Sequence, residues 1–96
     1  MIMSKQSSFK MSGRVDGTNA DSYEKSILGL LKDVEESLSI DLTELTYISS
    51  LGLRVFLKVA KALKEQNKKL VLFKPTQAIL DLLLMSGFDK IIEIEK

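Results

Sequence analysis

The sequence contains no cysteine and no histidine, and only one proline in 96 residues. Without cysteine no disulfide framework can form, and without either residue the commonest ligands for zinc and iron are missing. We therefore expect no metal and no other cofactor. The apolar runs are far shorter than the roughly 20 residues of a membrane-spanning helix, and the first residues lack the apolar core of a signal peptide. These absences indicate a cytoplasmic protein that does not insert directly into a membrane.

An excess of charge of one sign is also lacking. The 14 lysines and arginines nearly balance the 13 aspartates and glutamates, which leaves a formal net charge of +1. This balance provides no basic footprint for nucleic acid, so no nucleic-acid partner is expected. Hydrophobic residues make up 45% of the chain, which is enough to build one core in a single domain of this size.

The apolar pattern of the first half alternates between the periods of strands and helices. Residues 9–15 and 38–42 have strand patterns, and residues 43–48 are expected to be a connection. Asp21 and Glu24 suit the N-terminal cap of a first helix. Its amphipathic stripe consists of Ile27, Leu30, Leu31, Val34 and Leu38.

The second half repeats the alternation. A second helix is predicted at residues 50–66, a strand covered on both faces at 69–73, and a last strand at 90–94. Thr76 can cap a third helix, and Gly87 fits the left-handed residue at its end. The apolar face of the second helix is expected to consist of Leu53, Phe56, Leu57, Ala60 and Leu63.

Strands that alternate with helices over short loops predict an α/β fold with right-handed crossovers. We expect one domain over residues 9–96, with a mostly parallel sheet of four or five strands and three or more helices. Residues 1–8 are expected to be a flexible N-terminus or a short edge strand.

Two adjacent serines, Ser49 and Ser50, lie between the expected connection and the second helix. One hydroxyl is expected to cap the helix, since its first backbone N–H groups lack partners, and such a cap is worth about 1 kcal/mol. Capping does not explain the bulky Leu51 at an exposed helix end. Alternatively, a hydroxyl here is a phosphorylation site, because the helix dipole tolerates added negative charge whereas a docked partner does not. Gly52 is then expected to leave the backbone uncovered for that partner.

The segment IDLTELTYISSLGLRVFL, residues 40–57, resembles the central signature of STAS domains, particularly the bacterial anti-sigma factor antagonists. The matching residues are Asp41-Leu42-Thr43, Tyr47-Ile48 and Ser50-Leu51-Gly52-Leu53. Residues 11–16 resemble an earlier strand end of the family, and residues 83–92 resemble its closing helix-to-strand segment. The resemblance therefore covers about residues 9–94.

The resemblance implies a STAS-like fold and a non-enzymatic switch in transcription regulation. In that family, a partner anti-sigma factor that is also a serine kinase phosphorylates the serine two residues before the glycine, which matches Ser50. The unphosphorylated protein would bind this kinase and release the sigma factor, phosphorylation would end the binding, and a serine phosphatase would restore it. The same alignment puts Asp16 in the loop beside Ser50, and Leu51, Leu53 and Arg54 on the exposed first turn that a partner reads.

This sequence departs from the family pattern at three places. Ser49 stands where many members carry aspartate, which makes it a second candidate acceptor, although the spacing to Gly52 favours Ser50. Arg54 replaces a second glycine and offers a cation to a phosphate or an acidic partner. The chain also starts late and stops at Lys96, so a shortened first strand and a missing last helix are expected. The expected partner-binding residues are Asp16, Ser49, Leu51, Gly52, Leu53 and Arg54.

Two other classes of function are alternatives. A STAS docking subunit of a membrane transport or other signalling complex would use Ser50 only as an unmodified cap. An enzyme is disfavoured because a serine nucleophile usually needs a histidine base. The two Ser-x-x-Lys pairs, Ser7/Lys10 and Ser22/Lys25, are about as many as chance predicts in a chain rich in both residues.

Overall fold

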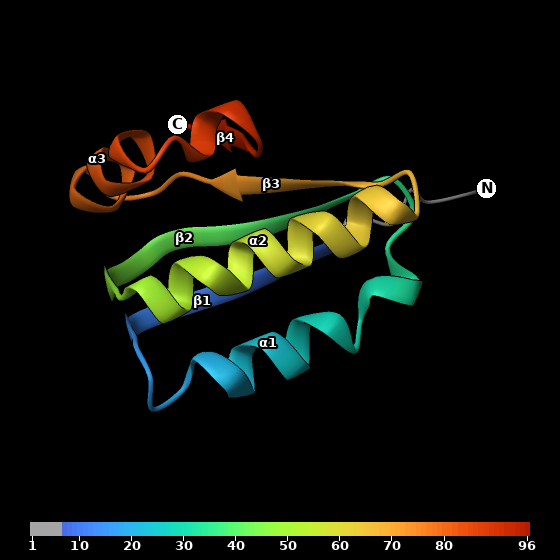
Figure 1. Cartoon of the computed structure of the whole chain (residues 1–96), viewed down its shortest axis with the longest axis horizontal. Coiled ribbons are helices and arrows are strands. Elements are labelled where there is room, and N and C mark those ends of the chain that lie inside the picture. The colour runs from blue at the N-terminus through green and yellow to red at the C-terminus, as the bar shows by residue number, and fades with distance from the viewer. Residues whose placement is uncertain (1–6) are drawn as a thin grey trace.

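A computed structural model describes residues 7–96 as a four-stranded parallel sheet in the order β1-β2-β3-β4, with helices between the strands (Figure 1). The strands are β1 (Ser7–Val15), β2 (Ser37–Ile48), β3 (Lys69–Phe73) and β4 (Glu93–Glu95). The α-helices are α1 (Ala20–Leu28), α2 (Ser50–Glu65) and α3 (Gln77–Met85), and 3₁₀ turns lie at η1 (Leu31–Asp33) and η2 (Phe88–Lys90). This arrangement confirms the predicted α/β class and mostly parallel sheet.

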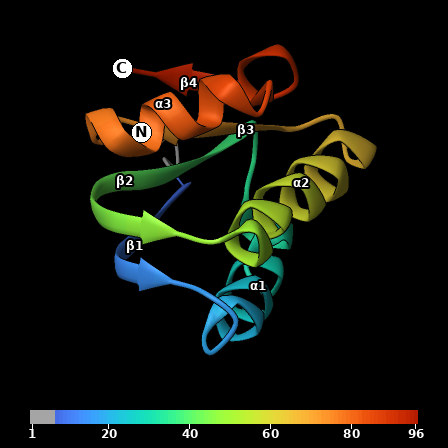
Figure 2. The same cartoon turned by 60° about the vertical axis from the view of Figure 1, so that its left-hand side comes forward.

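The strands run parallel because a helix carries the chain back to the same end of the sheet between successive strands. The helices α1 and α2 lie side by side against one face of the sheet (Figures 1 and 2). β1 begins at Ser7, two residues before the predicted strand, and the expectation for residues 1–6 lies outside the described residues.

β2 is much longer than the predicted strand, and residues 43–48 continue it instead of forming a connection. Leu38, Ile40 and Leu42 are buried in strict alternation, but the next buried residues, Leu45 and Ile48, follow at intervals of three. At two register shifts against β1, β2 advances by one extra residue, as in a β-bulge. The alternation of buried and unburied residues with a period of two therefore ends before β2 ends.

α1 is shorter than predicted and begins earlier. Asn19 is the N-cap residue and makes no capping hydrogen bond with its side chain, so the predicted cap by Asp21 and Glu24 is wrong. The helix ends at Leu28. Leu38, which had been assigned to the helical stripe, is a buried residue of β2.

α2 begins at the predicted residue and ends at Glu65, one residue earlier than predicted. Its buried face is rotated from the predicted stripe, because Leu57 is 39% exposed and both Leu53 and Ala60 are only partly buried. The buried residues of α2 are Gly52, Val55, Phe56, Val59 and Leu63. The inclusion of a glycine in this face determines how closely α2 approaches the sheet.

The last third of the described chain follows the predicted pattern closely. The Thr76 hydroxyl accepts a hydrogen bond from the backbone N–H of Ile79 at 3.4 Å, which confirms the cap of α3. Gly87 has a φ of 76°, the left-handed conformation predicted for the end of that helix. The final strand is short: Ile91 and Ile92 precede β4 instead of forming part of it.

One apolar core joins the sheet to all three α-helices. Ile27 of α1, Phe56 of α2 and Leu83 of α3 are fully buried in it, and the buried side chains of residues 7–96 are all apolar. The core therefore contains no titratable group, and any chemistry lies at the surface. No helix in residues 7–96 has both the length and the hydropathy required to cross a bilayer.

Candidate functional site

The two predicted site segments meet at the carboxyl ends of β1 and β2. Val15 is paired with Ile48 in the parallel register, so both strands stop at the same edge of the sheet. The backbone N–H of Ser49 donates to the carbonyl of Val15 at 2.9 Å. This hydrogen bond holds the start of α2 beside the loop that follows β1, at the edge where open α/β sheets commonly carry their sites.

The two serines have different positions. Ser49 is the N-cap residue of α2, and its hydroxyl oxygen accepts a hydrogen bond from the backbone N–H of Gly52 at 3.4 Å. Ser50 is the first residue of the helix and is exposed to solvent. Within residues 7–96, the Ser50 side chain makes no hydrogen bond. Capping therefore accounts for Ser49 and leaves the function of the Ser50 hydroxyl unexplained.

The expected role of Gly52 is wrong. Gly52 is buried, so it does not present an uncovered backbone to a partner. A Cβ atom there would lie 2.5 Å from Cγ1 of Ile48 and 2.9 Å from Cγ1 of Val15, closer than such atoms can approach. Gly52 is needed because the first turn of α2 packs tightly on the ends of β1 and β2.

The first turn of α2 presents a mixed surface to solvent. Leu51 is 46% exposed, Leu53 is partly buried and Arg54 is exposed. The loop after β1 lies against this turn, since a Cβ atom on Gly17 would be 3.2 Å from Cδ1 of Leu51. The predicted proximity of the two segments is therefore present, and a bulky apolar side chain beside Ser50 is accessible to another protein.

Asp16 holds the loop after β1 in its shape. Its carboxylate accepts hydrogen bonds from the hydroxyl and the backbone N–H of Thr18, and its Oδ2 lies 3.9 Å from Nε of Arg14. Asn19 ties the loop to β1, because its side chain accepts from the N–H of Asp16 and donates to the carbonyl of Arg14. The hydrogen bonds from Thr18, aided by Arg14, lower the pKa of Asp16, so this carboxylate is charged at neutral pH.

Arg14 and Tyr47 form a feature beyond the predicted site residues. They are opposite each other in the register of β1 and β2, and the guanidinium carbon lies 4.2 Å from the centre of the Tyr47 ring. Tyr47 is 42% exposed. This cation stacked on an exposed ring lies one residue before both strands end, at the same edge of the sheet as Ser50. The sequence carried no signal for this pair, because residues 43–48 were expected to be a connection and the pairing depends on the register of two strands.

The arrangement cannot activate its own serine. The chain has no histidine or cysteine, and no carboxylate or amine within residues 7–96 forms a hydrogen bond with the Ser50 hydroxyl. Nucleophilic attack by a serine requires such a base. Across the same residues, no group of three or more aspartates and glutamates is gathered as a metal site would require. Within these residues, the Ser50 hydroxyl therefore has no base beside it.

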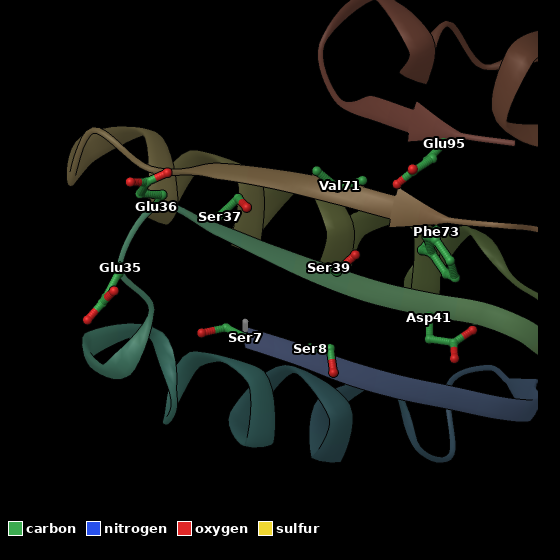
Figure 3. Close-up of a pocket in the computed structure, with 10 residues that line it drawn as sticks. All are labelled: Ser7, Ser8, Glu35, Glu36, Ser37, Ser39, Asp41, Val71, Phe73 and Glu95. Carbon is green, nitrogen blue, oxygen red and sulfur yellow. The ribbon is translucent and has the colours of Figure 1, made fainter. Parts of the chain in front are cut away.

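A separate groove of about 580 Å³ lies on the face of the sheet away from α1 and α2 (Figure 3). Ser8, Ser39, Asp41 and Glu95 are among the residues that line it. The backbone N–H of Thr43 donates to Asp41 at 2.9 Å and lowers the pKa of that carboxyl. None of the residues that line this groove comes from the first turn of α2, so the groove is not part of the candidate site.

The sequence profile of the STAS domain matches residues 5–96. The chain belongs to the STAS domain family. This membership confirms the resemblance carried by residues 40–57. A solved structure, the anti-sigma factor antagonist SpoIIAA in its unphosphorylated form, superimposes with a TM-score of 0.75 over 100% of this chain and 84% of that one. At 12% sequence identity, this likeness establishes the fold alone.

Curated relatives of this STAS domain have regulatory names. BtrV of Bordetella bronchiseptica, named as an anti-sigma factor antagonist, is 36% identical over 78 residues, which cover 81% of this chain and 67% of BtrV. The anti-sigma-B factor antagonists of Listeria monocytogenes and Listeria innocua are each 41% identical over 58 residues, 60% of this chain. The alignment spans about half, 51%, of each Listeria protein.

Proposed function

We propose that this STAS domain is a cytoplasmic, non-enzymatic anti-sigma factor antagonist. In its unphosphorylated form it binds an anti-sigma factor that is also a serine kinase, and the sigma factor is thereby released. The relatives in Bordetella and Listeria support the class of function. The observation that carries the proposal for this chain is the exposed hydroxyl of Ser50, next to a different serine that already caps the helix.

The proposed switch is phosphorylation of Ser50 by the bound kinase. Oγ of Ser50 attacks the γ-phosphorus of ATP, the bond from that phosphorus to ADP breaks, and the hydroxyl proton passes to a base of the kinase. The product carries about −1.5 to −2 charges at neutral pH. The positive end of the α2 dipole tolerates these charges, so the domain stays folded. Hydrolysis of the phosphoserine by a phosphatase restores the hydroxyl.

Phosphorylation is proposed to act on the partner's contact surface. Leu51 supplies an exposed apolar contact, and the charged Asp16 and Arg54 flank it from the loop and the helix. Burying a phosphate on Ser50 against an apolar or acidic partner surface would cost free energy, because the phosphate would lose its bound water without gaining a partner. The partner surface therefore could not pack against these neighbouring residues. Ser49 is the weaker candidate acceptor, because its oxygen is already bonded to the N–H of Gly52.

Displacement of sigma factor tests this function. Serine-kinase anti-sigma factors from the same cell, each loaded with its sigma factor, are mixed with the protein without ATP, and released sigma factor is measured by size-exclusion chromatography. We expect release by wild type and by Ser50→Ala. After incubation with ATP, wild type is expected to lose this activity and Ser50→Ala to keep it. Failure of the wild type to bind any such kinase would contradict the proposal and favour a docking subunit without a switch.

A further inference from the structure

A groove lined by lysines lies at the opposite end of α2 from Ser50. The residues that line it belong to the C-terminal half of α2, the turn after α2, the start of β3, and the segment from the end of η2 to the start of β4. The groove has a volume of about 580 Å³. Its five lysines are Lys61, Lys64, Lys68, Lys69 and Lys90. At the helical rise of about 1.5 Å per residue, Lys64 lies about 21 Å along the axis from Ser50.

Most of the positive charge in this groove is not neutralised by the domain itself. Lys69 pairs with Glu93 at 2.8 Å, and Nζ of Lys68 donates to the carbonyl of Leu31 at 3.2 Å. The other three lysines make no hydrogen bond or ion pair within residues 7–96, and they are Lys61, Lys64 and Lys90. Because the net charge of the whole chain is only +1, this concentration of lysine is a local feature rather than a general one.

The groove also has an apolar part. Ala60 and Leu70 contribute to its lining, and Ile91 lies there with 64% of its surface exposed. An isoleucine this exposed is stabilised when a partner covers it. The combination of an uncovered apolar side chain with a rim of unpaired amines matches a ligand that carries carboxylates and an apolar group together.

We propose that this lysine groove is a second docking surface, and that its occupant is an acidic segment of a partner protein with an apolar side chain among its carboxylates. A concave groove holds an extended segment, whereas a flat bilayer would touch only its rim. Nucleic-acid phosphates would use the lysines but leave Ile91 uncovered. The surface does not depend on the switch at Ser50, and the distance between the two ends of α2 lets both be occupied at once.

A labelled peptide provides the test. The probe is a fluorescein-labelled 12-residue peptide in which glutamates alternate with leucine and phenylalanine, and its anisotropy is measured with the full chain at low ionic strength. We expect saturable binding, and the double substitution Lys61→Glu and Lys64→Glu should weaken it at least about tenfold. Lys25→Glu is the control, because Lys25 is also exposed but lies on α1, outside the groove. It should change the affinity less than about twofold.

The apolar contact is tested separately with Ile91→Ser, which alters an exposed side chain and should leave the fold intact. We expect about fivefold weaker binding of the leucine-phenylalanine peptide and no change for a peptide of glutamate and serine. Circular dichroism checks that each variant is folded, and Lys64→Gln replaces the double variant if that one is not. Amide shifts in NMR spectra should cluster at residues 60–70 and 90–93.

Three results would overturn the proposal. The first is a peptide that does not bind, or that binds the double variant as tightly as wild type. The second is equal binding of the peptide of glutamate and serine, since the apolar part would then be irrelevant. The third is binding of phosphatidylserine vesicles or of a single-stranded oligonucleotide in preference to the peptide, which would assign the groove to a membrane or to nucleic acid.

Discussion

The helices α2 and α3 begin in the same way and differ at the next residue. Ser49 accepts a hydrogen bond from the N–H three residues later at 3.4 Å, and Thr76 does the same at 3.4 Å. The first residue of α3 is Gln77, whereas the first residue of α2 is Ser50, a second hydroxyl. One hydroxyl thus suffices to cap a helix in this fold, and the second one in α2 is available for another use.

The residues that follow strengthen the contrast. The second position of α2 holds Leu51, which is 46% exposed, and the second position of α3 holds the small Ala78. An exposed leucine side chain at a helix start has an unfavourable free energy of hydration, and it does not improve the cap. The start of α2 therefore has features of a contact surface, and the start of α3 has only those of a helix end. Two of the four predictions below compare the starts of α2 and α3 directly, and the other two concern residues that hold the start of α2 and the loop beside it.

The largest effect is expected for Ser50→Asp. The carboxylate imitates part of the charge of a phosphate, so binding to the partner kinase should weaken about tenfold to hundredfold, or about 1.4–2.8 kcal/mol. Isothermal titration calorimetry measures the affinity. Gln77→Asp is the matched control, because it adds the same charge at the start of α3, and it should leave binding unchanged. If Ser50→Asp binds the kinase with the affinity of wild type, the start of α2 is not a contact surface that differs from the start of α3.

Gly52→Ala is expected to have the largest effect on stability. The new methyl group would overlap Ile48 and Val15, and such overpacking costs about 1–3 kcal/mol. Denaturant unfolding should show this loss as a lower free energy of unfolding. Ser50→Ala, an exposed change two residues away, should stay within about 0.5 kcal/mol of wild type. A fully stable Gly52→Ala would mean that α2 does not pack as closely on the sheet as described.

The caps themselves are expected to be equivalent. Ser49→Ala and Thr76→Ala should each lower the free energy of unfolding by about 1 kcal/mol, since each leaves one N–H without its partner. Thermal unfolding compares them directly, and each should lower the Tm by about 4–8 °C. If Ser50→Ala destabilises the protein as much as Ser49→Ala does, the two serines share the cap and the assignment of roles is wrong.

The smallest effect concerns Asp16. Its pKa is lowered in the folded protein by Thr18 and Arg14, so its stabilising effect is present above the ordinary pKa of aspartate, about 3.9, and is lost as pH falls through the folded value. The difference in unfolding free energy between wild type and Asp16→Asn should therefore be constant from pH 5 to pH 8 and shrink only below about pH 4. A difference that changes between pH 6 and pH 8 would assign the titration to another group.

Local chemistry made several features predictable from the sequence. The start of α2 at Ser50, the Thr76 cap and the left-handed Gly87 each depend on one residue and its immediate neighbours. The alternation of strands and helices likewise predicted the parallel sheet. The proximity of Asp16 to the first turn of α2 followed from the resemblance to STAS domains, because no local pattern joins two loops so far apart in sequence.

Features that depend on distant residues could not be read from the sequence. Bulges against β1 shift the spacing of buried residues in β2 from two to three. Residues 43–48 therefore lack the alternating apolar pattern by which a strand is recognised in a sequence. The need for Gly52 arises from the side chains of Ile48 and Val15, so the sequence indicated only that the residue is small. The stacking of Arg14 on Tyr47 likewise depends on the register between two strands.

The central claim is that the hydroxyl which does not cap α2 is the one that receives a phosphate. Mass spectrometry tests this claim after incubation of wild type, Ser49→Ala and Ser50→Ala with a binding serine-kinase anti-sigma factor and ATP. The account predicts phosphate on Ser50 in wild type and in Ser49→Ala, and none in Ser50→Ala. Phosphate on Ser49, or modification that persists in Ser50→Ala, would contradict it.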